Sequence, residues 1–188
     1  AQVWARTPRG PWLADFLAAI WPLRLDDGQR WQALVDELFT HWTRGHLLFD
    51  PQKGLLPEAT LRLVNALRRS GDERLAPCLE RLLAVAGPCY RWPDRMHPLT
   101  LGGVGEQPHD IRASAAYLSL LAELLVSEDA TRRELLLFQN IPPRWWQGSG
   151  SIKVSGRQTS YGGIGVKVEF QPKQVKLMLS PRFHTLPD

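Results

Sequence analysis

The feature that most constrains the fold of this chain is a single change in hydrophobic period near Glu128 and Asp129. Before this point, apolar residues recur at spacings of three and four, as they do on one face of a helix. Beyond it, apolar and polar residues alternate, which is the pattern of a strand with one buried face. The sequence therefore predicts an α+β protein, in which antiparallel helical hairpins precede a small antiparallel β-sheet.

Short turns divide the helical part into amphipathic segments, an arrangement typical of helical hairpins. Helices are expected at residues 15–21, 26–45, 57–69, 74–86 and 110–126. The segment at 26–45 begins at a capping aspartate, and Gly45 is its expected stop.

Three regions are predicted along the chain: a helical-hairpin region at 1–138 with a long polar loop at 87–109, a linker at 139–150, and an antiparallel β domain at 151–188. A few strands with one apolar face must pack on another layer. We therefore expect the helical region, a partner chain or a missing N-terminal portion to cover the strands.

Composition excludes several classes of protein. Of the 188 residues, 44% are hydrophobic and 22% are charged, which is ordinary for a globular protein. No apolar run reaches the roughly 20 residues of a membrane helix, so no membrane span is expected. The basic excess, a net charge of +4, falls entirely within residues 151–188. It indicates either an acidic partner or a solvated strand face whose lysines discourage edge pairing, and it is too small to indicate nucleic acid.

The cysteines and glycines suggest no cofactor. Cys78 and Cys89 form no metal-binding pattern and are expected to be buried thiols in a reducing, cytoplasmic compartment. A single disulfide bond between them is the alternative. The glycines at 102–105 lack the lysine of a phosphate-binding loop. No regular spacing of histidines predicts a metal site.

The long loop at 87–109 gathers most of the polar chemistry of the chain. It contains Trp92, Asp94, Arg95, His97, Glu106 and His109. Carboxylates, imidazoles and an aromatic ring suit a neutral polyol, and glycoside hydrolysis needs two carboxyl groups about 5–9 Å apart. Asp94 and Glu106 are the candidate catalytic pair. In the alternative interpretation, Asp94 pairs with a neighbouring arginine and Asp110 caps the last helix.

Eight tryptophans are the unusual feature of the composition. Tryptophan most often fills a core or an interface. Its ring also lies well against a sugar, which makes Trp92, Trp145 and Trp146 candidate sugar-binding residues.

Several segments together resemble a known family. They are residues 92–98 (WPDRMHP), 102–106 (GGVGE), 115–117 (AAY), 141–146 (IPPRWW), 151–154 (SIKV) and 161–164 (YGGI). In this order they are similar to the C-terminal portion of (α/α)6-toroid, or six-hairpin, glycosidases. At residues 106–109, where that family carries an acidic-Gly-His-His run, this chain keeps only Glu106 and His109.

The resemblance implies a partial toroid with sugar-binding loop residues. Arg95, His97 and His109 would bind the sugar beside the tryptophans, and Asp94 and Glu106 would orient hydroxyls or donate a proton. Six hairpins need some 350 residues, so this chain has room for two or three. Glycoside hydrolase activity would then require the missing hairpins.

Two functions of different class remain open at this stage. The chain is either the C-terminal part of a carbohydrate-active protein or a non-catalytic structural or interaction module. In the second case the tryptophans serve as packing, and the chain docks on a larger partner or on the missing N-terminal portion.

Overall fold

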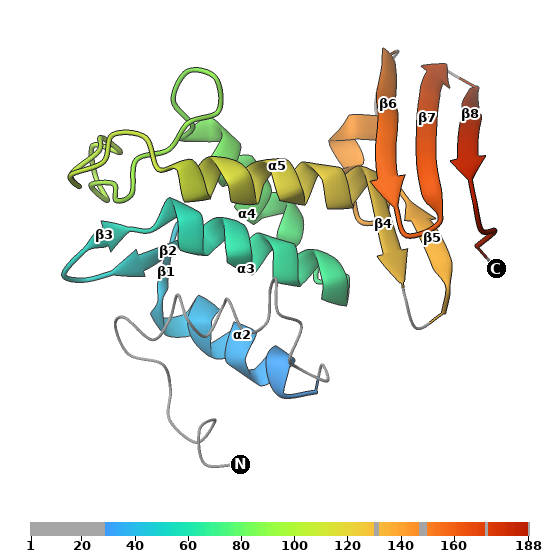
Figure 1. Ribbon diagram of the computed structural model, residues 1–188. Coiled ribbons are helices and arrows are strands. Elements are labelled where there is room, and N and C mark those ends of the chain that lie inside the picture. The colour runs from blue at the N-terminus through green and yellow to red at the C-terminus, as the bar shows by residue number, and fades with distance from the viewer. Residues whose placement is uncertain (1–28, 130–131, 147–149, 172, 188) are drawn as a thin grey trace. The chain divides into compact units, whose positions relative to one another are not determined.

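The computed structural model describes residues 29–129, 132–146, 150–171 and 173–187 (Figure 1). The chain divides into two compact units, residues 1–120 and 121–188. The division falls within the last helix and not in the linker expected at 139–150. The helix expected at 15–21 lies outside the described residues.

The first unit combines helices with a small antiparallel sheet of order β1-β2-β3. Its elements are α2 (Gln29–His41), β1 (Thr43–Arg44), β2 (Leu47–Asp50), β3 (Gly54–Leu55), α3 (Pro57–Ser70), α4 (Leu75–Ala84) and the start of α5 (Ile111–Leu125). The expected helices at 57–69, 74–86 and 110–126 are confirmed. Gly45 does not stop a helix: α2 ends earlier, and Gly45 takes a φ of 56° in the turn between β1 and β2.

Helix α3 forms the centre of the core of this unit. Leu61, Leu63 and Leu67 on it are fully buried. The Thr60 hydroxyl donates to the Leu56 carbonyl at 2.8 Å and accepts from the Leu48 amide at 3.0 Å, which ties the helix to β2. The helix ends at Gly71, whose φ of 68° is the left-handed conformation that glycine adopts without strain.

The second unit contains a hairpin and a three-stranded antiparallel sheet. The elements are β4 (Val126–Asp129), β5 (Glu134–Leu137), the 3-10 helix η1 (Pro143–Trp146), β6 (Gly150–Thr159), β7 (Gly162–Gln171) and β8 (Gln174–Phe183). Strand β7 is central. Its even-numbered residues from Ile164 to Phe170 are buried, and the odd-numbered residues occupy the other face, as the period predicted.

Two apolar rows are exposed, one in each unit. On α5, Ile111 and Leu118 are 80% and 65% exposed. On β8, Val175, Leu177 and Leu179 are about half exposed, although the register places them on the same face as the buried row of β7. The apolar face of β7 is therefore covered, and the expected covering partner or N-terminal portion at β8 stays a prediction.

None of the helices in the described part of the chain is long and apolar enough to cross a membrane.

An ion pair at the start of α4 yields a prediction about acid stability. The Asp72 carboxylate accepts from the Arg74 amide at 2.9 Å and from the Arg74 guanidinium at 2.5 and 2.8 Å, and its side chain is 5% exposed. These bonds from Arg74 lower the pKa of Asp72 below its ordinary value of 3.8. A carboxyl whose pKa is lowered by folding stabilises the folded state above that ordinary value and loses this effect as the pH falls through the lowered pKa.

We expect Asp72→Ala to reduce the free energy of unfolding by about 1–2 kcal/mol at pH 7. The difference from the unmodified chain should shrink as the pH falls below about 4. Urea unfolding at both pH values, followed by circular dichroism, measures it. Equal destabilisation at pH 7 and pH 2.5 would contradict the assignment to the Asp72–Arg74 pair.

Candidate functional site

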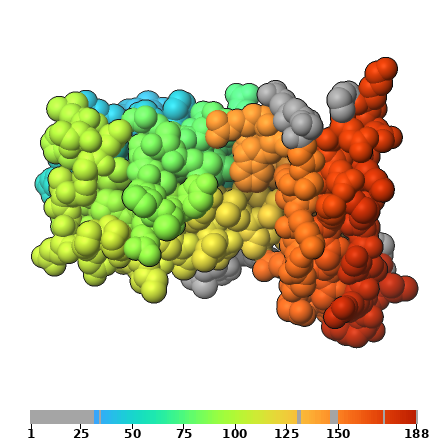
Figure 2. Space-filling view, turned by 90° about the horizontal axis from the view of Figure 1, so that it is seen from above, coloured from blue at the N-terminus to red at the C-terminus, as the bar shows by residue number. Residues whose placement is uncertain are grey.

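The loop at 87–109 lies at the surface of the first unit, where its atoms are yellow-green in Figure 2. Its first anchor is Trp92, which is fully buried. The indole N–H donates to the Leu82 carbonyl at 3.1 Å, and the ring meets the Tyr117 ring edge-on at 5.1 Å. A ring without exposed surface has no face for a sugar. This burial corrects the expectation that Trp92 stacks on a ligand and makes it a core residue.

A second anchor fastens the loop to the small sheet. The backbones of Met96 and Leu55 exchange two hydrogen bonds, at 2.8 and 3.0 Å, and Met96 is 2% exposed. Gly54, with a φ of 91°, allows this approach, because a Cβ there would lie 2.4 Å from the Met96 carbonyl oxygen. The loop is therefore held by both its apolar side chains and its backbone.

The two candidate catalytic acids have different surroundings. The Asp94 carboxylate lies against Gly105, and its Oδ2 is 3.5 Å from the Arg95 Nε. Its Oδ1 is buried without a hydrogen-bond partner among the described residues. Glu106 is exposed. The Asp94 amide donates a hydrogen bond to the carbonyl of Gln107, the residue after Glu106, at 3.1 Å. The backbone thus brings the two segments together, while Asp94 also has the arginine neighbour of the alternative interpretation.

Asp110 has the capping role that the alternative interpretation gave it. Its carboxylate, 1% exposed, accepts from the Arg112 amide at 2.9 Å and from the Arg112 guanidinium at 3.0 Å. These bonds raise the pKa of Arg112. The position just before α5 satisfies a backbone donor of the first turn, so Asp110 acts in folding.

The two histidines of the loop are placed differently. His97 Nδ1 accepts from the Leu99 and Thr100 amides, both at 3.2 Å. In the neutral ring the proton then lies on Nε2, which can donate to a ligand. His109 is exposed and lines a hollow of about 350 Å³. Among the described residues, no cluster of three or more His, Cys, Asp or Glu side chains could hold a metal ion.

Arg91 is one of the side chains of this hollow, and Tyr90 precedes it in the chain. Arg91 lines it, together with Pro93, Met96 and Gly103. Tyr90 is 57% exposed, and its ring stacks on that of Tyr117 at 5.5 Å and 29°. One face of the Tyr90 ring thus packs against protein, which restricts the motion of the ring, and the rest of the ring is exposed to solvent.

The sequence did not single out Tyr90 as a functional residue. Cys89 and Tyr90 both adopt positive φ values, of 59° and 53°. Consecutive left-handed residues other than glycine are strained, and such strain gathers at functional sites. No residue pattern predicts this conformation. The available signal of a site was the presence of two aromatic residues within one irregular passage.

The remaining two candidates belong to the second unit. Trp145 lies in η1, partly exposed, and its amide donates to the Pro142 carbonyl at 2.9 Å. The side chain of Trp146 lies outside the described residues. The sugar-binding roles of both therefore stay predictions.

Comparisons with protein families, with curated proteins and with solved structures found no match to this chain.

The two thiols yield a prediction about reactivity. Both cysteines are free, and Cys89 is exposed where burial was expected. Burial raises the pKa of Cys78 to about 12, which keeps it protonated at neutral pH. Because the thiolate is the nucleophile, iodoacetamide at pH 8 should label Cys89 and leave Cys78 unmodified in the folded chain, as read by peptide mass spectrometry. Comparable labelling of both, or of neither, would contradict this arrangement, and urea should expose Cys78.

Proposed function

We propose that this chain is a sugar-binding, non-catalytic part of a glycoside hydrolase-like protein. The observation that carries the proposal is the half-exposed ring of Tyr90, which stacks on Tyr117 and directly precedes Arg91 in the chain, where Arg91 and His109 line a hollow. A fixed aromatic face beside a few convergent polar groups is the usual form of a small-molecule site.

Each group has a distinct role in this proposal. The ring of Tyr90 lies against the apolar face of a sugar, as was expected of Trp92. Arg91 donates to sugar hydroxyls, and His109 donates or accepts. His97 and Arg95 extend the polar border, with the Nε2 proton of His97 directed to ligand by the bonds that occupy Nδ1.

Hydrolysis by this chain alone does not fit the surroundings of the two acids. A general acid at neutral pH needs a poorly hydrated carboxyl whose pKa is raised. Glu106 is exposed to water, and Asp94 has Arg95 at 3.5 Å. We therefore propose that these acids orient hydroxyls, and that catalysis takes residues from further helical hairpins of a toroid.

Glycan-array binding followed by titration calorimetry on the best-bound sugar tests the proposal. Tyr90→Ala should weaken binding by about tenfold or more, because it removes the stacking face. Leu99→Ala is the matched control, since Leu99 is 73% exposed in the same loop and does not line the hollow. Unchanged affinity in Tyr90→Ala, or an equal loss in both variants, would refute the role of Tyr90.

A second function, that of a docking module, is favoured by the exposed row of Ile111 and Leu118 on α5. A helix that is apolar on two sides normally packs on two neighbours. The occupant that this chain can itself supply is the same row of a second copy. Sedimentation equilibrium tests this occupant: contact between the two rows predicts a dimer that Leu118→Glu dissociates, and a monomer in both would contradict it.

A further inference from the structure

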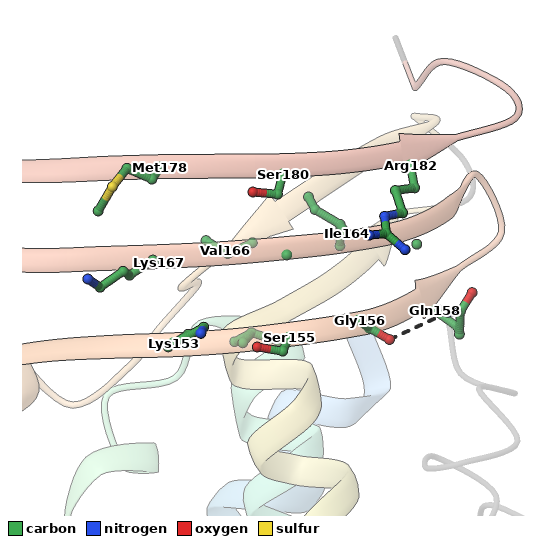
Figure 3. Close-up of a pocket in the computed structure, with 13 residues that line it drawn as sticks. Lys153, Ser155, Gly156, Gln158, Ile164, Val166, Lys167, Met178, Ser180 and Arg182 are labelled. Atoms are coloured by element: carbon green, nitrogen blue, oxygen red, sulfur yellow. Dashed lines mark hydrogen bonds between the residues drawn. The ribbon is translucent and has the colours of Figure 1, made fainter.

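The second unit contains a hollow that the loop site does not use. It has a volume of about 450 Å³ and lies on the face of the β6-β7-β8 sheet opposite the buried row of β7 (Figure 3). The side chains around it come from all three strands. They include Lys153, Ser155 and Gln158 of β6, Lys167 of β7, and Ser180 and Arg182 of β8.

Two glycines of the central strand form the floor of this hollow. A Cβ on Gly163 would lie 3.5 Å from the Gln158 amide nitrogen, and one on Gly165 would lie 3.4 Å from the Ser180 Cβ, both ordinary contact distances. Neither glycine has a left-handed φ. The fold therefore does not require glycine at either position. Glycine weakens the interior of a strand and often marks the close approach of another molecule.

The basic side chains beside the floor are arranged in a way that destabilises the sheet. The register sets Lys153 directly opposite Lys167, and like charges in that position repel. Lys167 pairs with Glu169 at 2.6 Å, whereas Lys153 and Arg182 have no carboxylate partner among the described residues. Lys167 is on the central strand, so the protection of a sheet edge does not account for it. The Arg182 side chain reaches over β7 toward the floor (Figure 3).

We infer that this face binds an anionic oligosaccharide, whose sugars carry carboxylate or sulfate groups. Lys153, Lys167 and Arg182 would pair with the anions. The serine hydroxyls and the Gln158 amide would bond sugar hydroxyls above the bare glycine floor. This site is independent of the loop site of the first unit.

The aromatic residues of the sheet argue against a nucleic acid as the ligand. Proteins that bind single strands stack the bases on aromatic rings. Phe170 is buried on the opposite face of the sheet, and the register places Phe183 with Gly162 on that face as well. The described residues of the basic face contain no aromatic side chain on which a base would stack.

Titration calorimetry on the full chain at low ionic strength tests this inference. The probes are hexagalacturonate for the carboxylate source, a heparin hexasaccharide for the sulfate source, neutral maltohexaose, and a single-stranded DNA 12-mer. At least one anionic sugar should bind, and its affinity should fall with added salt. Equal affinity for maltohexaose, or tighter binding of the DNA, would overturn the assignment.

Matched variants locate the binding. Lys153→Gln should weaken binding of the anionic sugar by about tenfold, because one charge-assisted contact is lost. Lys173→Gln makes the same charge change in the turn before β8, outside the hollow, and should have little effect. Equal losses in both variants would show general charge attraction and refute the site.

Filling the floor provides a test that leaves charge unchanged. Gly165→Val should abolish binding while circular dichroism and the melting temperature show an intact sheet. Gly150→Ala, where an added Cβ meets nothing within 4 Å, is the control. Tyr90→Ala should leave this binding intact, which separates it from the loop site. Undiminished affinity in Gly165→Val would refute the hollow as the site.

Discussion

The burial of Trp92 is the interaction on which the arrangement of the loop depends. Its indole N–H bond to Leu82 and its edge contact with Tyr117 fix the loop at one point. The Asp110 amide donates to the Trp92 carbonyl at 2.8 Å, so the same residue also sets where α5 begins. Trp92 is buried, whereas Tyr90, two residues earlier, is 57% exposed and also contacts Tyr117. The candidate site is thus a consequence of core packing.

The sequence predicted the long elements well and the short ones poorly. Helices α3 and α5 and strand β7 each span at least ten residues, enough for a period of 3.6 or of two to be recognised. Strands β1 and β3 have two residues each, and no period exists at that length. The linker expected at 139–150 stays a prediction, and the contacts of the chain separate into two compact units at residues 120 and 121.

The candidate site shows the same distinction between local and long-range causes. The capping role of Asp110 was predictable, because a cap depends only on the residues that follow it. The neighbourhood of Asp94 depends on Gly105, eleven positions later, and the choice between Trp92 and Tyr90 depends on Tyr117. Packing between distant segments decides such choices, and a single sequence carries no direct signal for it.

The exposed row on β8 limits what can cover it. Strand β8 forms one edge of the sheet, and Pro181 within it has no N–H. A proline in an edge strand turns its nitrogen away from the neighbouring strand, so an added strand would meet a gap in its ladder. The opposite edge strand, β6, has a bulge between Val154 and Arg157, which also discourages pairing. Both edges therefore resist extension, whereas Val175, Leu177 and Leu179 offer an apolar face. The sheet is thus suited to being covered across its face by a second layer, and not to growth by further strands.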